Sequence, residues 1–491
     1  MNILIAASEA APFSKTGGLA DVCGSLPVEL NRSRNECALI IPAYRQTLQK
    51  GFDIQDPGLK FSAPVGDKTV EGRILKAVVP GSSTPVYLIY QKEYFDREGI
   101  YQNPDGSDYI DNCERYVFFC RAVMETIRLL DLKVDILHAN DWQTGLIPAY
   151  LKTEYRLYPR YANIASLFTI HNLAYQGSFW HWDMNLTGLD WKYFNMHQME
   201  AYGRLNLIKT GIAFADAVST VSPRYALEIQ SAPLGCGLEG ILQCRSRDLY
   251  GILNGVDLNA WNPESDDNIA QTYNVSTWRE GKRACKKALL QQLGLHEDPK
   301  HHDAPLLGTV GRLSFQKGYD LIAEVMRRIA PHHPAQWVVL GTGEACYQNM
   351  LLDLQNQFPN KIAVRLMYSD EMAHQIIAGS DLFLMPSRYE PCGLTQMYAL
   401  HYGTLPVVHS TGGLADTVVN TTQHTLADNS ANGFAFENDA IDEFTNCVNN
   451  ALWTYYQKET RSTLIERGMK QDWSWSRSAS QYVQLYEKIK H

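Results

Sequence analysis

The chain alternates short apolar runs with longer amphipathic stretches, and this alternation predicts buried β-strands separated by helices. In the first half, runs typical of buried strands occupy residues 3–7, 38–41, 86–90, 134–137, 165–170 and 217–221. Helical periodicity lies between most of these runs, as in residues 19–30 and 116–130. Strands that alternate with helices indicate an α/β fold with a doubly wound parallel sheet.

The same pattern begins again after the polar stretch 296–304. Further strand-like runs follow at residues 306–310, 337–340, 362–366, 382–385 and 405–408. Two sheets in succession predict two Rossmann-like domains, divided near residues 250–257. We therefore expect an N-terminal domain over 1–250, a C-terminal domain over 251–470, and a C-terminal helix over 471–491 that could pack back on the N-terminal domain.

Composition narrows the class of protein. A chain of 491 residues, 45% of them hydrophobic, can bury large cores in two or three domains. Its net charge of −9 argues against bulk binding to nucleic acid or to an anionic membrane. A phosphate-bearing ligand would therefore have to be held by a few well-placed basic side chains.

The cysteines and the apolar runs indicate where in the cell the protein is expected. The ten cysteines are scattered without Cys-x-x-Cys or zinc-like spacing, which predicts reduced thiols in a cytosolic protein and no metal site. The apolar N-terminal run is short and meets Glu9, so we interpret it as a first strand rather than a signal peptide. No run approaches the length of about eighteen apolar residues that a membrane span needs.

The stretch 381–416 carries the most informative chemistry. A strand-like run leads through Glu-Pro-Cys-Gly at 390–393 into a predicted helix at 394–402. Amides at that helix start, from Gly393 to Gln396, favour an anion such as phosphate. A carboxylate at Glu390 would repel this anion, so we expect it to face neutral hydroxyls such as those of a sugar. The alternative is a helix-capping acid on a surface loop.

One six-residue motif occurs twice. Thr-Gly-Gly-Leu-Ala-Asp at 16–21 recurs at 411–416, each time between a strand and a predicted helix. Glycine pairs let a ligand approach the main chain closely, so we expect two equivalent loops that face one cleft. Lys15 precedes the first copy and suits a diphosphate, although a lone lysine there is also typical of a solvated surface.

A basic loop, Gly-Arg-Leu-Ser-Phe-Gln-Lys-Gly, follows the strand-like run 306–310. Arg312 can hold a phosphate through two parallel hydrogen bonds, and Lys317 adds a charge at the next helix start. Two cations in such a loop of an acidic protein favour phosphate binding over a solvated surface.

Polar clusters also follow two strand-like runs of the first half. They are His-Ala-Asn-Asp-Trp at 138–142 and His-Asn-Leu-Ala-Tyr-Gln-Gly at 171–177, and both lie at the edge where open α/β sheets bind ligands. Each cluster offers hydrogen-bond donors, acceptors and an aromatic ring, as a polyhydroxylated ligand requires. The aromatic-rich segment 179–194 is either core or a platform for sugar faces.

Together these residues resemble the bacterial glycogen synthases, a group that includes the plant starch synthases. The shared motifs are Lys-Thr-Gly-Gly-Leu-Ala-Asp, His-Asn-Leu-Ala-Tyr-Gln-Gly, Asn-Gly-Val-Asp, Gly-Arg-Leu-x-x-Gln-Lys-Gly and Glu-Pro-Cys-Gly-Leu-Thr-Gln, in that order. The resemblance implies the glycosyltransferase-B fold of two facing Rossmann-like domains. It implies transfer of glucose from ADP-glucose to the non-reducing end of an α-1,4-glucan such as glycogen, with retained configuration. It also implies that no metal and no organic cofactor take part. The cysteine pattern, net charge and hydropathy described above predict a cytoplasmic protein with no nucleic-acid or membrane partner.

The resemblance also implies roles for individual residues. Glu390 and His171 would contact the glucose, and Arg312 and Lys317 would hold the diphosphate, as the catalytic set. Tyr368 matches an aromatic residue that stacks on adenine. The implied ADP-glucose-binding residues are Lys15, Gly17, Gly18, Asp21, Asp141, Asn172, Tyr368, Cys392, Gly393, Leu394 and Thr395.

Two positions depart from the family pattern. Asn140 stands where a second histidine is usual, and Met367 stands where a glycine usually precedes the stacking tyrosine. The second departure concerns the base pocket, and therefore the preference between ADP-glucose and UDP-glucose.

Three other functions share parts of this pattern. A glucan phosphorylase would need lysine-bound pyridoxal phosphate and a longer chain, and a sugar-nucleotide epimerase would need no glucan acceptor. The third is a catalytically silent glucan-binding protein, against which the intact Lys15, Arg312, Lys317 and Glu390 argue. Cofactor absorbance and an assay of glucan extension separate these alternatives.

Overall fold

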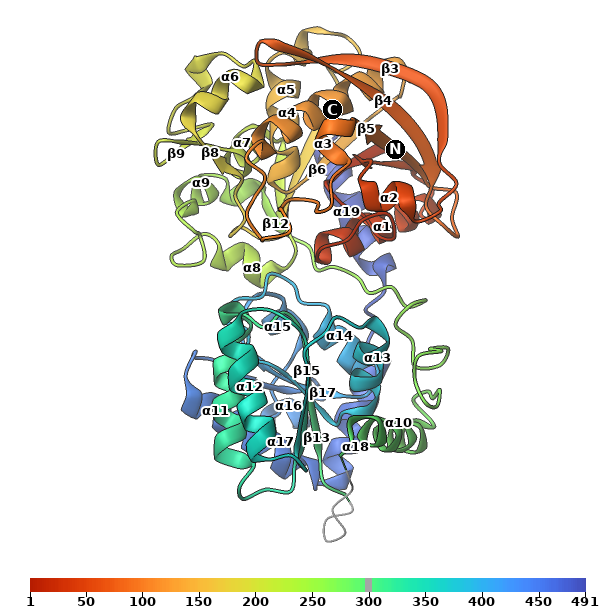
Figure 1. The fold of residues 1–491 in the computed structure, drawn as a ribbon, viewed down its shortest axis with the longest axis vertical. Coiled ribbons are helices and arrows are strands. Elements are labelled where there is room, and N and C mark those ends of the chain that lie inside the picture. Colours follow the sequence, from red (N-terminus) through yellow and green to blue (C-terminus); the bar gives the residue numbers. More distant parts are fainter. Residues whose placement is uncertain (296–302) are drawn as a thin grey trace. The chain divides into compact units, whose positions relative to one another are not determined.

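The computed structural model describes residues 1–295 and 303–491, so most of the polar stretch 296–304 lies outside the described residues. The chain divides into two compact units (Figure 1). Unit 1 comprises Met1–Gly255 together with Trp475–His491, and unit 2 comprises Val256–Ser474. The chain therefore leaves unit 1 after residue 255 and returns to it for the C-terminal helix.

Unit 1 is built on a nine-stranded sheet in the order β12-β11-β7-β6-β1-β2-β5-β4-β3. The strands from β12 to β5 in this order are parallel, whereas β3 and β4 form an antiparallel hairpin at one edge. The strands are β1 (Asn2–Ala6), β2 (Glu36–Pro42), β3 (Gln55–Val65), β4 (Lys68–Val78), β5 (Pro85–Tyr90), β6 (Ile136–Asn140), β7 (Ala165–Ile170), β11 (Ala217–Thr220) and β12 (Leu249–Gly251). A separate small sheet contains β8 (Ser178–Phe179), β10 (Arg204–Asn206) and β9 (Glu200–Ala201).

Helices cover both faces of this sheet because successive side chains of a strand point to opposite faces. In β1, Ile3 and Ile5 join the core that includes α1 and α19, whereas Leu4 and Ala6 join the core that includes α4 and α5. The helices are α1 (Gly18–Arg32), α2 (Arg45–Gln49), α3 (Lys92–Phe95), α4 (Asn112–Leu129), α5 (Leu146–Lys152), α6 (Met184–Thr187), α7 (Leu207–Phe214), α8 (Pro223–Glu228), α9 (Glu239–Cys244) and α19 (Trp475–Ile489).

Unit 2 is built on a six-stranded parallel sheet in the order β15-β14-β13-β16-β17-β18. Its strands are β13 (Leu306–Val310), β14 (Gln336–Leu340), β15 (Ile362–Arg365), β16 (Leu382–Met385), β17 (Leu405–His409) and β18 (Phe434–Phe436). The helices are α10 (Trp278–Leu293), α11 (Tyr319–Ile329), α12 (Ala345–Gln357), α13 (Asp370–Gly379), α14 (Thr395–His401), α15 (Gly412–Thr417), α16 (Gln423–Ala427), α17 (Ile441–Tyr455) and α18 (Lys458–Lys470). The expected α/β class with two Rossmann-like sheets is confirmed.

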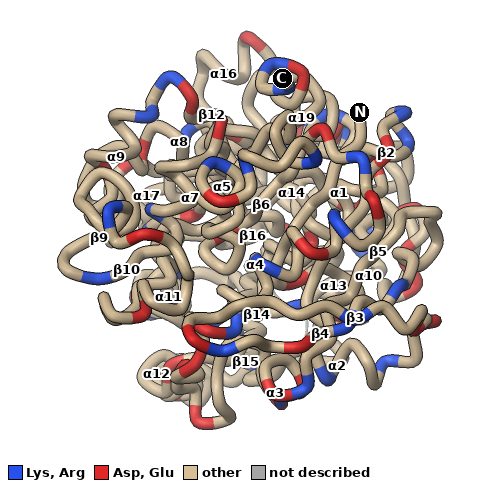
Figure 2. Tube along the Cα trace, turned by 90° about the horizontal axis from the view of Figure 1, so that it is seen from above, with Lys and Arg blue, Asp and Glu red and all other residues tan. Residues whose placement is uncertain are grey.

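Charge is distributed rather than segregated by sign. Figure 2 shows Lys and Arg positions interspersed with Asp and Glu positions. All ten cysteines are free thiols, and no helix in the described part of the chain is long and apolar enough to cross a membrane.

Candidate functional site

Sheet order marks the ligand-binding edge of each unit. An open parallel sheet binds ligands beyond the carboxyl ends of two neighbouring strands whose connections run in opposite directions. In unit 1 these strands are β1 and β6, and in unit 2 they are β13 and β16. The loops after β1 and β6, and after β13 and β16, contain most of the residues selected from the sequence.

The loop between β1 and α1 presents an open glycine pair. A Cβ atom added to Gly17 or Gly18 would meet no atom within 4 Å, so the backbone can be approached closely there. Nζ of Lys15 lies 2.8 Å from Oδ1 of Asp21, in the first turn of α1. Four residues selected from the sequence thus lie together at this helix start.

Glu9, which sequence reasoning did not select, fixes this loop. Its carboxylate accepts hydrogen bonds from the backbone N–H of Thr16, from Oγ1 of Thr16 at 2.8 Å and from the hydroxyl of Tyr101 at 3.3 Å. Burial raises the pKa of Glu9 to about 7, although these hydrogen bonds lower it in part. The signal that could have revealed Glu9 is its position directly after the first strand, at the ligand edge.

The ends of β6 and β7 hold His171 from two sides. Oδ1 of Asp141 accepts the backbone N–H of His171 at 2.7 Å, and Oδ1 of Asn140 lies 2.9 Å from its Nε2. Asp141 has φ 58° and ψ −179°, a backbone region that is essentially restricted to glycine and costs on the order of 1–3 kcal/mol. Burial raises the pKa of Asp141 to about 7, although the N–H groups of His171 and Asn172 oppose this shift. The carboxylate of Asp141, carried on this strained backbone, thus orients the loop that contains His171 and Asn172.

His138 does not take part in this edge. It is buried, with Nδ1 2.8 Å from the hydroxyl of Tyr486 and Nε2 2.6 Å from Oγ1 of Thr169. Both ring nitrogens therefore serve packing between the sheet and α19. The interpretation of the whole 138–142 cluster as a ligand site is wrong for this residue.

The aromatic segment after His171 is partly exposed. Trp180, Trp182 and Trp191 form a row, with successive ring centroids 6.4 and 5.4 Å apart and the rings tilted edge to face. All three indoles are exposed, so the segment is not simply core. A sugar-binding role for it stays a prediction.

In unit 2, the loops after β13 and β16 meet through an ion pair. Nζ of Lys317 lies 2.5 Å from Oε2 of Glu390, which also accepts a hydrogen bond from Oγ of Ser387 at 3.0 Å. Glu390 is only 7% exposed, so it does not match the surface-loop alternative. Arg312, in the same loop as Lys317, is exposed. A cation and a buried carboxylate thus stand side by side at the switch point of the sheet.

The loop from Glu390 to Thr395 is held by its neighbours. Gly393 has φ 68°, and Nε2 of Gln396 donates to the carbonyl oxygens of Cys392 and Gly393 at 3.0 and 3.1 Å. Leu394 is the N-cap residue of α14, which begins at Thr395. The main chain therefore reaches the start of α14 in a fixed conformation, with first-turn amides that have no partner inside the helix.

The two copies of the repeated motif differ in their surroundings. A Cβ added to Gly412 would lie 2.0 Å from the carbonyl oxygen of Glu390, and one added to Gly413 would lie 2.0 Å from that of Cys392. The second pair therefore supports the 390–392 loop, and the N–H of Gly413 donates to Glu390 O at 3.0 Å. The expectation of two equivalent loops is wrong, because the glycines of the second copy pack against the main chain of residues 390–392 whereas those of the first copy are open.

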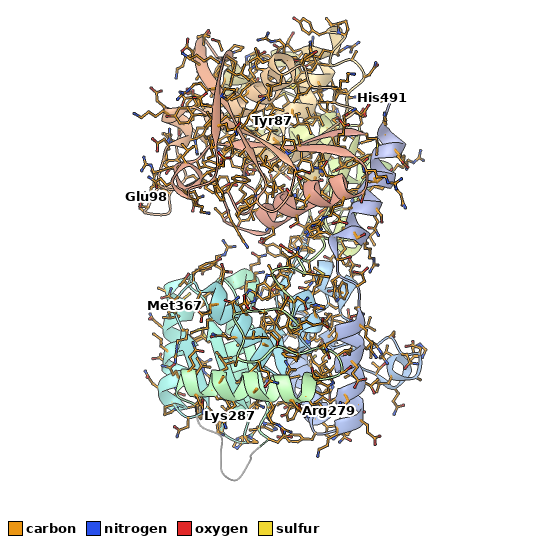
Figure 3. The ribbon with its side chains drawn as sticks, turned by 90° about the vertical axis from the view of Figure 1, so that its right-hand side faces the viewer. Tyr87, Glu98, Arg279, Lys287, Met367 and His491 are labelled. Carbon is orange, nitrogen blue, oxygen red and sulfur yellow. The ribbon has the colours of Figure 1, made fainter. Side chains whose placement is uncertain are left out.

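Met367 and Tyr368 follow β15 at the same edge of the sheet. Met367, labelled in Figure 3, is 45% exposed, and Tyr368 is 75% exposed. The hydroxyl of Tyr368 donates to Oδ1 of Asp370 at 2.8 Å. An exposed ring with a tethered hydroxyl is suited to stacking on a flat ligand group.

The structure groups the selected residues into three local clusters. One contains Lys15, Gly17, Gly18 and Asp21, the second contains Asp141, His171 and Asn172, and the third contains Lys317, Glu390 and the loop to Thr395. Arg312 and Tyr368 are exposed and lie on other loops of unit 2, after β13 and β15. Across residues 1–295 and 303–491, no group of three or more His, Cys, Asp or Glu side chains is arranged to hold a metal ion.

Comparison with known proteins places the chain in a family. Residues 2–244 match the family described as starch synthase catalytic domain, and residues 295–471 match glycosyl transferases group 1. A glycogen synthase of Rhodopirellula baltica is 44% identical over 99% of this chain and 98% of the relative. A glycogen synthase of Syntrophotalea carbinolica is 43% identical over 99% of both proteins.

A solved structure agrees with this assignment. The catalytic domain of starch synthase IV from Arabidopsis thaliana, bound to ADP and acarbose, has a TM-score of 0.90 and 32% identity, covering 99% of both chains. Sucrose-phosphate synthase from Thermosynechococcus elongatus, at 15% identity and a TM-score of 0.60, shares the fold. The chain therefore belongs to the glycogen and starch synthase family of glycosyltransferases, with the glycosyltransferase-B fold.

Proposed function

We propose that the protein transfers glucose from ADP-glucose to the non-reducing end of an α-1,4-glucan, with retention of configuration at the anomeric carbon. The observation that carries this proposal is the Lys317–Glu390 pair at the switch point of the unit 2 sheet. A lysine suits a diphosphate, and a buried carboxylate suits neutral hydroxyls beside it. A nucleotide sugar contains both a diphosphate and the neutral hydroxyls of a sugar.

The donor is held, in this proposal, mainly by charge and by backbone amides. Arg312, Lys317 and the first-turn amides after Gly393 bind the diphosphate. Lys15, Asp21 and the backbone of Gly17 and Gly18 also bind ADP-glucose, and Tyr368 stacks on the adenine. The ADP present in the Arabidopsis starch synthase IV structure supports a donor of this class.

Polar groups bind the glucose in this proposal. They are His171, Asn172, Asp141 and Glu390, with Cys392, Leu394 and Thr395 contributing chiefly through backbone. Because burial lowers the pKa of His171 to about 3, its imidazole is neutral at neutral pH and acts through hydrogen bonds rather than charge.

The reaction breaks the bond between the anomeric carbon and the β-phosphate oxygen of ADP-glucose. The new bond joins that carbon to the 4-hydroxyl oxygen of the glucan, whose proton passes to the departing ADP. Arg312, Lys317 and the helix-start amides stabilise the charge that develops on ADP, and Glu390 offsets positive charge at the anomeric carbon. This route on one face of the sugar retains its configuration without a covalent enzyme intermediate. We propose that it uses no metal or organic cofactor and takes place in the cytoplasm.

A chain-extension assay tests the proposal. The purified protein is incubated with maltoheptaose and either ADP-glucose or UDP-glucose, and the products are measured by mass spectrometry together with the nucleotide released. We expect a ladder of products one hexose apart, one ADP per added glucose, and faster transfer from ADP-glucose. Extension from glucose 1-phosphate alone would point to a phosphorylase, and binding of maltoheptaose without extension would point to a silent glucan-binding protein.

A further inference from the structure

The side chain of Asn140 lies between three partners, and its orientation is therefore determined. Its Nδ2 donates to the carbonyl oxygen of Ala6 at 3.2 Å and to that of His138 at 3.3 Å. Its Oδ1 lies 2.9 Å from Nε2 of His171. Asn140 ends β6, which pairs with β1 on one side and β7 on the other, and it is fully buried.

These contacts assign the amide without ambiguity. A carbonyl oxygen can only accept a hydrogen bond, so the amide group of Asn140 must direct its NH₂ toward Ala6 and His138. The opposite atom, Oδ1, can also only accept, and it faces the ring of His171. The ring nitrogen that it contacts, Nε2, must therefore carry a hydrogen.

The other ring nitrogen of His171 is then unprotonated. Burial lowers the pKa of His171 to about 3, so the ring holds a single proton at neutral pH. With that proton on Nε2, Nδ1 presents a lone pair. Within the described part of the chain, Nδ1 of His171 makes no hydrogen bond to the protein. His138 differs, because both of its nitrogens are bonded within the protein.

We propose that Asn140 is a positioning residue that holds His171 in the Nε2–H tautomer, so that Nδ1 accepts a hydrogen bond from a hydroxyl of the transferred glucose. The proposal rests on the function proposed above. It specifies the direction of the hydrogen bond between His171 and the glucose: Nδ1 accepts and the hydroxyl donates. A glucose analogue in which that hydroxyl is replaced by hydrogen would lose the contact. A histidine held as the opposite tautomer would present an N–H at this position and would meet the hydroxyl as a donor.

The test reads the tautomer directly. The complete protein is labelled with ¹⁵N at its histidine rings, and the signals of His171 are identified by their absence from His171→Gln. We expect a proton on Nε2 and an unprotonated Nδ1 in the wild-type protein at neutral pH. A proton on Nδ1 of His171 would overturn the proposal, and this measurement needs no variant of Asn140 to fold.

Variants at Asn140 then connect the tautomer to the reaction. Asn140→Ala removes the acceptor, so we expect both tautomers in the spectrum and a kcat about tenfold lower, the scale of one hydrogen bond. The KM for maltoheptaose should stay within about twofold. Asn140→Asp keeps an acceptor opposite Nε2 and should retain the single tautomer, although its carboxylate faces two carbonyl oxygens and lowers stability. An Asn140→Ala protein with one tautomer and normal kcat would contradict the proposal.

A control variant separates this role from general packing. Tyr486→Phe removes the hydroxyl that lies 2.8 Å from Nδ1 of His138, in the same buried region of the sheet. It should lower Tm but leave kcat and the His171 tautomer unchanged.

The proposed function and the proposed role of Asn140 are refuted by different results. A wild-type protein without glucosyl transfer refutes the proposed function, whereas a transferring protein with the wrong His171 tautomer refutes only the role of Asn140.

Discussion

Replacing Glu390 by glutamine keeps the shape of the side chain and removes its charge. In the structure this carboxylate is buried and holds Lys317 at 2.5 Å and the hydroxyl of Ser387 at 3.0 Å. Glutamine can still accept from one of these groups, so the loop should persist. The substitution thus separates the electrostatic role of Glu390 from its place in the fold.

The expected effects differ in sign for binding and for catalysis. A hydrogen bond between charged groups contributes about 1.5–3 kcal/mol, and Lys317 would no longer have to give it up to meet a diphosphate. ADP affinity should therefore stay unchanged or increase by up to about tenfold, equivalent to about 1.4 kcal/mol. The kcat should fall by about a hundredfold or more, because positive charge at the anomeric carbon develops only in the transition state.

Three measurements on Glu390→Gln separate a catalytic role of Glu390 from a structural one. They are kcat with ADP-glucose and maltoheptaose, the Kd of ADP by calorimetry, and Tm. Asp381→Asn is a matched control, since it disrupts the Lys286–Asp381 pair at 2.6 Å, at the opposite end of β16 from Glu390. That variant should lose stability and keep its ADP affinity. If Glu390→Gln instead retained near-normal kcat while its Tm fell, the carboxylate would be structural and its assignment to glucose would be wrong.

Three further predictions concern the donor site, the pH dependence of stability and the need for a metal. Lys15→Gln should raise the KM for ADP-glucose by about tenfold with little change for glycogen, because one charge-assisted contact to the diphosphate is lost; an equal rise for both substrates would mean that Lys15 supports the fold. Glu9 has a pKa of about 7 in the folded protein against 4.5 when exposed, so the folded state binds more protons and stability falls as pH rises from 4.5 through 7. Glu9→Gln should therefore reduce the loss of Tm between pH 5 and pH 7.5. If the variant lost as much Tm as the wild-type protein, groups other than Glu9 would cause the pH dependence. Transfer from ADP-glucose should be insensitive to EDTA, and a rate that is lost with EDTA and restored by a divalent cation would contradict a metal-free reaction.

The sequence predicted the parallel strands well because these strands are buried on both faces. The runs at 306–310 and 382–385 coincide with β13 and β16, and the run at 165–170 coincides with β7. Such strands are continuously apolar, so hydropathy alone reveals them. The final helix also lies close to the range expected from its amphipathic pattern.

Two features of the sheets were missed for physical reasons. The β3–β4 hairpin has exposed polar residues alternating with buried ones, so it contains no continuous apolar run. Its Gly66-Asp67 turn, with φ 60° at the glycine, was the available signal. The strand expected at 134–137 occupies Ile136–Asn140 instead, because His138 and Asn140 are buried polar residues whose hydrogen bonds hydropathy does not reveal.

The candidate site was predictable as motifs but not as contacts. Lys317 and Glu390 were selected separately, yet their pairing depends on β16 lying next to β13 in the sheet. Likewise, Asn140 was recognised only as a departure from a pattern. Its bond to His171 required the neighbouring ends of β6 and β7. The packing role of the second glycine pair also became visible only with the backbone of Glu390 and Cys392 in place.

The stereochemistry of the product tests the proposed reaction most directly. Maltoheptaose is extended with ADP-glucose labelled with ¹³C at the anomeric carbon, and the new linkage is observed by NMR as it forms. Retaining transfer predicts a labelled α-1,4 linkage at the non-reducing end, with one ADP released for each labelled linkage. A labelled β linkage, or free labelled glucose released without extension, would contradict a retaining glucosyl transfer at this site.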